Sequence, residues 1–318
     1  MDQQTSNVIY STKALAVLSI ICAHVTPLNP SFGSAHVNSV SFLSIFGSIG
    51  VGIFYFFSGF FLASSKKQFT VFWKTKIKSI VLPWVICGTL VYVYQFVHKG
   101  ERASVTDWFY LLIGNGTYLY YLTCLIVFYC ICFPFRNKKA TFFVLCIVSL
   151  ISIMLTIFSD ILSNYNPYLN PLNFGIWFAI GALVFLNNAL DSIVCFFKNH
   201  IILVVVFSVS LLLLVCTIAF SSINYDYFKV LYIPCETFAI FASLGFGFVL
   251  SRFSLFVDIG KQSFAIYLLH YPVAGAITYL SNKVDFWLVT VLRGMIVLSV
   301  TYSVIWTIHR ISKPQLKC

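Results

Sequence analysis

The chain has 318 residues, of which 60% are hydrophobic, 18% aromatic and only 9% charged, and its mean hydropathy is +0.93. This composition excludes a soluble globular domain and is typical of a polytopic membrane protein. The formal net charge of +11 does not indicate a nucleic-acid partner, because the basic residues lie in short loops, where they set membrane topology.

Ten apolar segments are long enough to be membrane-spanning helices. They lie at 8–27, 42–64, 79–98, 117–135, 140–158, 171–188, 200–221, 231–250, 262–281 and 286–308. A shorter apolar run at 108–113 is expected to lie at the membrane interface. Every loop is too short to fold by itself. We therefore expect an all-α protein in which residues 1–318 form a single integral membrane domain.

The positions of the basic residues predict the orientation of these spans. With a cytoplasmic N-terminus, fourteen of the 20 Lys and Arg residues fall in inner segments and four in outer loops, while Lys13 and Arg293 lie within spans. Lys and Arg accumulate on the cytoplasmic side of membrane proteins. Both termini are therefore expected in the cytoplasm.

The ten cysteines are interpreted as small apolar residues, because most of them lie inside apolar segments. The chain has no CxxC motif, and Cys130 and Cys132 would point about 200° apart on a helix. The sequence therefore predicts no metal site.

Ionisable side chains inside the expected spans are the main candidates for function, because such groups are costly in lipid and usually face the protein interior. They are Lys13, His24, Glu236, His270 and Arg293. Lys13 and His24 are eleven positions apart, which is roughly three helical turns and about 16 Å of rise, so both share one helix face. A neutral imidazole can accept a proton from an attacking hydroxyl, and a lysine can hold a phosphate.

Depth in the membrane sorts the other three candidates. Glu236 and Arg293 are expected in the outer half, near the level of His24, whereas His270 lies near the middle. Glu236 is the best available acid to orient His24. A salt bridge between Glu236 and Arg293, which would only join two helices, is an equal alternative.

Two polar segments have both a functional and an ordinary interpretation. Five lysines lie in the inner segment 66–78, which is expected to be a loop. It could bind the phosphates of a nucleotide-bearing donor or only set topology and contact anionic lipid. The outer segment 161–174 is rich in Asn and Pro and contains Tyr165 and Tyr168. It could contact a sugar, but an ordinary solvated turn is favoured.

Four motifs, in order along the chain, resemble those of the membrane acyltransferase-3 family. The first is Lys13-x10-His24, and the second is Phe54-Tyr-Phe-Phe followed by Ser58-Gly59. The third is Lys74-Thr-Lys76-Ile-Lys78 with Pro83-Trp84, and the fourth runs from Ile259 to Pro272 and includes Tyr267 and His270. Weaker similarities lie at 118–122 and 175–181. Together they cover nearly the whole chain.

The resemblance implies acyl transfer, commonly of acetyl, from cytoplasmic acyl-coenzyme A to a hydroxyl of a cell-surface or lipid-linked glycan. Acyl-coenzyme A would be a co-substrate, with no permanently bound cofactor, and the location would be a bacterial cytoplasmic (inner) membrane. His24 matches the family's essential histidine, acting as general base or acyl relay, and Lys13 its basic partner. The predicted catalytic residues are His24, Lys13 and Glu236. The predicted substrate and acyl-coenzyme A residues are Ser58, Lys74, Lys76, Lys78, Tyr267, His270 and Arg293.

The chain departs from the family pattern at two places. Tyr10 stands where the family often has an acid, and the basic segment has lysines where arginines are usual. Lysine lacks the bidentate fork that recognises phosphate. The departures therefore concern binding of the acyl donor more than the fold.

A transporter or exporter of a glycan or acyl precursor is the alternative function, because it would also need charges inside the membrane. The sequence shows no inverted repeat and no matching pair of Gly/Pro-broken helices, which disfavours this alternative. The expected partners are acyl-coenzyme A, a glycan acceptor and membrane lipids, without nucleic acid. The acceptor's identity, the acyl length, the oxyanion stabiliser and the oligomeric state, including a homodimer, stay open.

Overall fold

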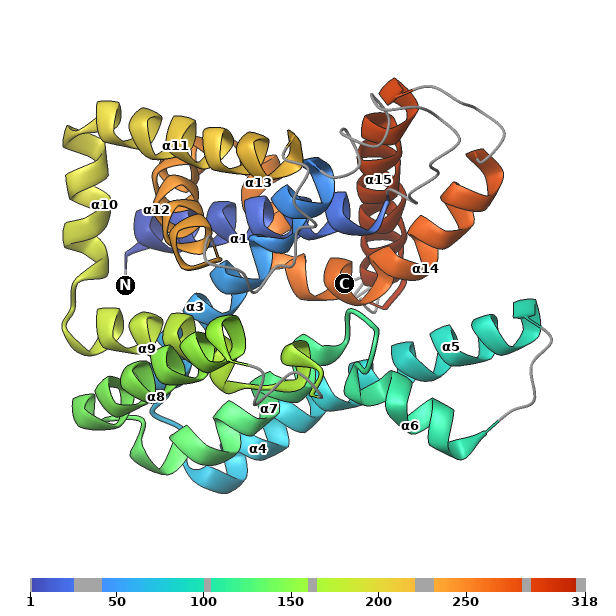
Figure 1. The fold of residues 1–318 in the computed structure, drawn as a ribbon, viewed down its shortest axis with the longest axis horizontal. Coiled ribbons are helices and arrows are strands. Elements are labelled where there is room, and N and C mark those ends of the chain that lie inside the picture. Colours follow the sequence, from blue (N-terminus) through green and yellow to red (C-terminus); the bar gives the residue numbers. More distant parts are fainter. Residues whose placement is uncertain are drawn as a thin grey trace, which may run out of the picture. The chain divides into compact units, whose positions relative to one another are not determined.

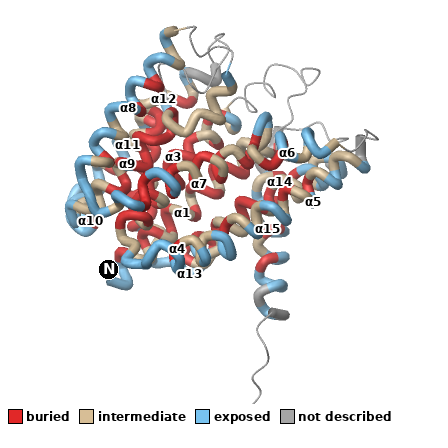
Figure 2. Tube along the Cα trace, turned by 90° about the horizontal axis from the view of Figure 1, so that it is seen from below, coloured by how far each residue is buried: buried red, intermediate tan, exposed pale blue. Residues whose placement is uncertain are grey.

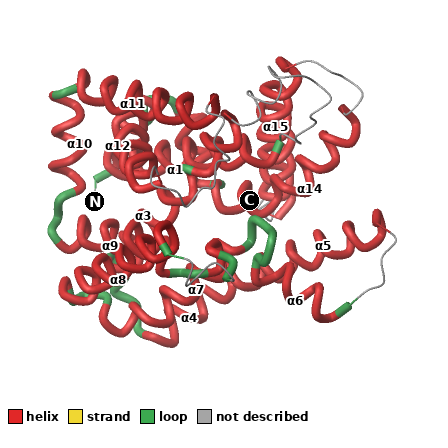
Figure 3. Tube along the Cα trace, in the orientation of Figure 1, coloured by secondary structure: helices red, strands yellow, loops and turns green. Residues whose placement is uncertain are grey.

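A computed structural model describes residues 2–25, 42–99, 104–159, 165–220, 232–281 and 287–312 (Figure 1). These residues form helices joined by short connections, with no strand among them (Figure 3). The predicted all-α class is therefore confirmed. Asp2 begins the first helix by accepting a hydrogen bond of 2.6 Å from the backbone N–H of Thr5, which satisfies one of the donors that a helix start leaves open.

Seven helices among the described residues are long and apolar enough to cross a membrane. An eighth results if α10 (Leu190–Asn199) and α11 (Ile201–Phe220), which are bent by 95° at His200, form one span. Shorter apolar helices at Tyr120–Phe135 and Leu292–Ile308 coincide with the fourth and tenth expected spans. Helices thus occupy all ten expected positions, whereas the number of crossings and the side of the termini stay predictions.

The chain packs as two compact units. Unit 1 comprises Met1–Ile53 and Ile193–Cys318, and unit 2 comprises Phe54–Ser192. The boundaries between the two units, at 53/54 and 192/193, fall within the residues of helix α3 (Gly50–Ala63) and of α10. The expectation of one membrane domain over the whole length stays a prediction.

Helix α1 (Gln3–His24) lies at the centre of unit 1. It packs against α12 (Tyr232–Leu250), α13 (Ser254–Lys261), α14 (Ser263–Ser281) and α15 (Trp287–Ser312). Most of its length is buried or half-buried (Figure 2). The sequence explains this placement, because a helix that carries Lys13 and His24 inside a membrane needs protein around it.

Small residues let the neighbours of α1 approach its backbone closely. A Cβ atom on Gly260 of α13 would overlap the carbonyl of Tyr10, and one on Gly247 of α12 would overlap the hydroxyl of Thr12. That hydroxyl donates to the carbonyls of Val8 at 2.8 Å and Ser243 at 3.2 Å. Such close packing and interhelical hydrogen bonding hold membrane helices together where hydrophobic burial is weak.

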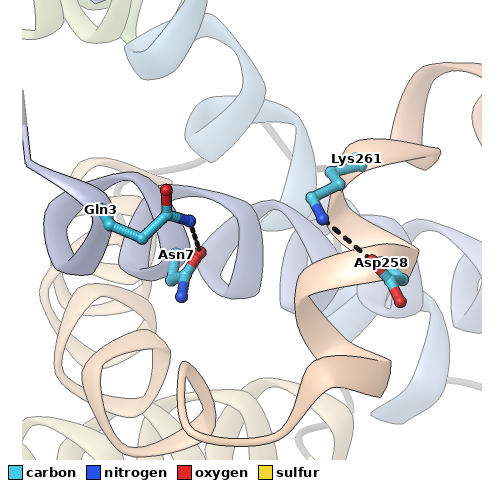
Figure 4. A network of polar contacts seen from close by, with 4 residues as sticks. All are labelled: Gln3, Asn7, Asp258 and Lys261. Atoms are coloured by element: carbon cyan, nitrogen blue, oxygen red, sulfur yellow. Dashed lines mark hydrogen bonds and ion pairs between the residues drawn. The ribbon is translucent and has the colours of Figure 1, made fainter.

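Two exposed polar pairs lie on α1 and α13, one on each helix (Figure 4). The Gln3 amide donates to the Asn7 side chain at 3.0 Å, and Lys261 forms an ion pair of 3.0 Å with Asp258. Each pair lies within one helix and is exposed, so it contributes little to stability.

Unit 2 contains the rest of α3 and the helices that follow it. They are α4 (Phe69–Lys76), the π-helix η2 (Ile77–Val81), α5 (Leu82–Lys99), α6 (Val105–Ile113), α7 (Tyr120–Cys132), the 3₁₀ turns η3 (Phe133–Phe135) and η5 (Pro167–Leu169), α8 (Lys139–Phe158) and α9 (Leu172–Leu186). The apolar run at 108–113 is thus part of the short helix α6. Lys74, Lys76 and Lys78 belong to helical turns, rather than to the loop that the sequence predicts, because α4, η2 and α5 are continuous.

A reciprocal glycine contact joins α3 to α9 within unit 2. A Cβ on Gly59 would overlap the carbonyl of Phe178, and a Cβ on Gly181 would overlap the carbonyl of Phe56. The Ser-Gly step of the second motif therefore has a packing reason, because the two backbones meet at Gly59.

Replacing Gly59 by Ala should destabilise the protein by about 1–3 kcal/mol, because two backbones must separate to admit the methyl group. The effect is measured as the thermal midpoint of the detergent-solubilised protein, determined by size-exclusion chromatography of samples heated to increasing temperatures. The matched control is Gly275→Ala, since a Cβ at Gly275 meets nothing within 4 Å. A midpoint for Gly59→Ala equal to that of the control would contradict the packing argument.

Candidate functional site

Lys13 and His24 lie on one uninterrupted helix, and both side chains are half-buried. Val17 and Ile20 stand between them on the same face and are only 0% and 2% exposed. Eleven residues make about three turns, so the face that carries the two polar groups is lined by protein between them. A lysine and a histidine are thus placed along one interior stripe of α1.

The ring of His24 contacts two side chains of α14. Its centroid lies 5.2 Å from that of His270, with the ring planes at 44°, and 5.6 Å from that of Tyr271 in an edge-to-face arrangement. These distances are typical of packed rings. The first motif and the fourth motif therefore meet at His24, and Tyr271 joins the site although sequence analysis did not single it out.

His270 is held by its own helix. Its side chain is completely buried, and Nδ1 lies 2.6 Å from the carbonyl oxygen of Tyr267. The Tyr267 ring, which is 3% exposed, packs 5.9 Å from the His270 ring. Pro272 follows inside α14. Because proline has no backbone N–H, this turn of the helix lacks one of its backbone hydrogen bonds.

The ammonium group of Lys13 lies over the ring of Tyr10, 5.9 Å from its centroid. Tyr10 occupies the position where the family often has an acid, and its ring supplies a cation–π contact in place of a carboxylate. Gly260 packs on the backbone of Tyr10. Helices α13 and α14 therefore follow α1 from Tyr10, near Lys13, to His24.

Glu236 and Arg293 are both buried in unit 1, with exposed fractions of 0% and 4%. The Glu236 carboxylate lies against the backbone of α3, where a Cβ on Gly52 would overlap it. Gly52 therefore makes room for the acid, a role that a lone glycine in an apolar helix does not reveal. Whether Glu236 orients His24 or pairs with Arg293 stays a prediction.

Lys76 is the half-buried member of the basic segment in unit 2, whereas Lys74 and Lys78 are exposed. Its ammonium donates to the Tyr129 hydroxyl at 3.4 Å and lies 4.6 Å from the centroid of that ring and 5.4 Å from that of Phe72. The three lysines therefore differ in their surroundings, because among them only Lys76 packs against aromatic rings.

Ser58 belongs to a second polar group in unit 2. Its hydroxyl shares a hydrogen bond of 2.9 Å with the Tyr121 hydroxyl, and the Tyr55 hydroxyl donates to the Tyr121 carbonyl at 3.3 Å. These aromatic hydroxyls come from the second motif and from the weakly similar segment at 118–122. The two segments therefore form one contact in the structure.

Arg136 forms hydrogen bonds to the backbone at the start of the basic segment, a role that its sequence position did not suggest. Its guanidinium donates to the carbonyls of Ser65 at 2.8 Å, Lys67 at 3.1 Å and Phe133 at 3.1 Å. It also lies 4.2 Å from the centroid of the Phe133 ring. This arginine, interpreted from sequence only as a topology signal, holds the chain that leads into α4.

The described part of the outer segment 161–174 uses its asparagines internally. The buried Asn173 accepts from Ser152 at 2.9 Å and Thr156 at 3.1 Å, and donates to the Pro167 carbonyl at 3.0 Å. Asn170 also donates to the Ser152 hydroxyl at 2.9 Å. The described part of this segment is thus a turn held by internal hydrogen bonds, and a contact with a sugar stays a prediction. Residues 160–164 lie outside the described residues.

Metal chemistry has no evident ligand set in the described ranges. Across residues 2–25, 42–99, 104–159, 165–220, 232–281 and 287–312, no three His, Cys, Asp or Glu side chains are grouped so as to hold an ion. The imidazole of His24 can accept and return a proton whether or not an ion is present.

Comparisons with known proteins identify the family. No curated protein and no solved structure matches the chain. The model of the acyltransferase 3 family, described as an acyltransferase domain, matches residues 10–310. This range contains the motif residues from Lys13 to Pro272, so the resemblance predicted from them is confirmed. The chain belongs to the acyltransferase 3 family and is a multi-pass membrane acyltransferase.

Proposed function

We propose that the protein is an O-acyltransferase of a bacterial cytoplasmic membrane. It moves an acyl group, most simply acetyl, from cytoplasmic acyl-coenzyme A to a hydroxyl of a cell-surface or lipid-linked glycan. The observation that carries this proposal is the interior stripe of α1, on which Lys13 and His24 are half-buried and the residues between them are buried. Membership of an acyltransferase family favours this function over the export of a precursor.

In the proposed reaction, His24 acts as general base. The proton of the acceptor hydroxyl passes to a ring nitrogen of His24 while the oxygen bonds to the thioester carbon. The carbon–sulfur bond then breaks, and the proton returns from His24 to the leaving thiolate. In the relay variant, a ring nitrogen of His24 first bonds to the thioester carbon and the coenzyme A thiolate leaves. The acceptor hydroxyl then attacks the acyl-imidazole, the carbon–nitrogen bond to His24 breaks, and the proton of the hydroxyl is passed through His24 to the thiolate.

Lys13 and Glu236 balance the charges that develop in this step. The Lys13 ammonium can stabilise negative charge on the donor, and the buried Glu236 carboxylate can offset the imidazolium formed at His24. Tyr267 and His270 line the same part of unit 1, and Arg293 contributes a further buried cation.

The lysines of unit 2 are proposed to bind the phosphates of the donor. Lys76 carries most of this proposal, because its ammonium is half-buried and held against Tyr129 and Phe72. Lys74 and Lys78 are exposed one turn or less away along α4 and η2. Ser58 is proposed to act through the tyrosine hydroxyl that it contacts. The lysines act as point charges, without arginine's bidentate geometry.

His24→Ala should lower acyl transfer by at least about 100-fold, the usual contribution of a general base, while the protein still inserts and folds. The assay incubates purified protein with labelled acetyl-coenzyme A, with and without a candidate glycan, and follows free coenzyme A and labelled glycan. Wild-type protein releasing coenzyme A without acceptor would favour the relay. His200→Ala, at the exposed bend between α10 and α11, is the control and should keep full activity. Transfer at the wild-type rate by His24→Ala would defeat the assignment.

Lys76→Met should raise the KM for acetyl-coenzyme A roughly tenfold, equivalent to about 1.4 kcal/mol, and leave kcat unchanged. Methionine keeps the apolar stem between the rings but removes the charge. An acetyl thioester of pantetheine, which lacks the nucleotide phosphates, should react equally well with both proteins. Lys198→Met, at an exposed lysine of α10, is the control. An unchanged KM for acetyl-coenzyme A would refute phosphate binding by Lys76.

A further inference from the structure

Two buried aromatic rings flank the ammonium group of Lys76 in unit 2. Phe72 lies one turn earlier on α4 and Tyr129 lies on α7, and their side chains are only 2% and 3% exposed. The two rings meet edge to face, with centroids 5.6 Å apart, and Phe133 of η3 packs 4.2 Å from Phe72. We call Phe72 and Tyr129 the aromatic cradle. Its rings are fixed by their own packing and do not depend on Lys76.

The aromatic cradle holds the ammonium of Lys76 without neutralising it. The Tyr129 hydroxyl accepts a hydrogen bond of 3.4 Å from Nζ, and both rings offer their faces to the cation, at 4.6 Å and 5.4 Å from their centroids. No carboxylate within the part of the chain that the structure describes forms an ion pair with Lys76. An ammonium has three N–H donors, so two of them are left to bind an anion.

We propose that Tyr129 is a positioning residue for Lys76 and thereby sets the affinity for the phosphates of the acyl donor. A lysine stem is flexible, and fixing it when a ligand binds costs conformational entropy. The aromatic cradle restricts the stem beforehand, so less of this entropy is lost on binding. The inference rests on the proposed function and deepens it, because it assigns the groups that make Lys76 a phosphate ligand.

Two substitutions separate the hydroxyl of Tyr129 from its ring. Tyr129→Phe removes the hydrogen bond and keeps the ring, and should raise the KM for acetyl-coenzyme A about threefold. Tyr129→Leu removes both and should raise this KM about tenfold, as much as Lys76→Met. In both variants kcat should be unchanged, and so should the reaction of the acetyl thioester of pantetheine, which has no nucleotide phosphates. Tyr110→Phe, at an exposed tyrosine of α6, is the matched control.

A double substitution tests whether Tyr129 acts through Lys76 or only packs α4 against α7. With methionine at position 76 there is no charge to position, so adding Tyr129→Phe to Lys76→Met should raise the KM no further. Effects that multiply in the double variant would overturn the proposal. So would an unchanged KM in Tyr129→Leu, or an equal loss with the pantetheine thioester.

A measurement on the wild-type protein keeps the inference testable if the Tyr129 variants do not fold. With carbon-13-labelled lysine, nuclear magnetic resonance should show the ε-methylene protons of Lys76 shifted upfield of those of the exposed lysines by the two rings. The signal is assigned by its loss in Lys76→Met. A Lys76 signal at the position of the exposed lysines would overturn the proposal.

The same signal separates failure of this inference from failure of the proposed function. If the wild-type protein transfers no acyl group to any acceptor, or if Lys76→Met leaves the KM for acetyl-coenzyme A unchanged, the proposed donor site fails. The upfield shift then still decides whether Tyr129 positions Lys76.

Discussion

The free-energy cost of an ionisable side chain in hydrocarbon is the constraint on which the rest of the structure depends. Lys13 and His24 each cost a few kcal/mol if they face lipid, so the helix that carries them must be surrounded by protein. Helix α1 meets this requirement because α12, α13, α14 and α15 pack around it. The small residues Gly247 and Gly260 let two of these neighbours reach its backbone. The centre of unit 1 is therefore built around its polar groups.

Close packing and chemistry share the same motifs. In the fourth motif, Gly260 contacts the backbone of α1, Tyr267 offers its carbonyl, and His270 meets His24. In the second motif, Gly59 brings α3 onto α9 while the neighbouring Ser58 bonds to a tyrosine hydroxyl. Each motif thus combines a glycine that allows two helices to pack closely with a polar residue that makes a contact between those or neighbouring helices. A substitution in either motif should change packing and reactivity together unless it is designed to separate them.

The sequence predicts much of the fold because membrane helices can be recognised by their length and hydropathy, and the described structure has helices at all ten expected positions. Helical periodicity also places Lys13 and His24 on one face. Periodicity within a helix says nothing about which distant helix packs against it. Three contacts therefore could be found only in the structure. They are those of His24 with His270, of Glu236 with Gly52, and of Arg136 with the carbonyls of Ser65 and Lys67. The lysine segment was wrongly expected to be a loop, because charge obscured the continuity of α4 with α5.

The proposed function requires water and substrate to reach the stripe of α1 that carries Lys13 and His24 from inside the protein. Substituted-cysteine accessibility in a cysteine-free background tests it most directly. Single cysteines at positions 13 and 24 should react with a small water-soluble thiol reagent in intact membranes. A cysteine in place of Leu18, about 140° around the helix from Lys13, should react far more slowly. Equal reactivity at all three positions, or none at 13 and 24, would contradict the account.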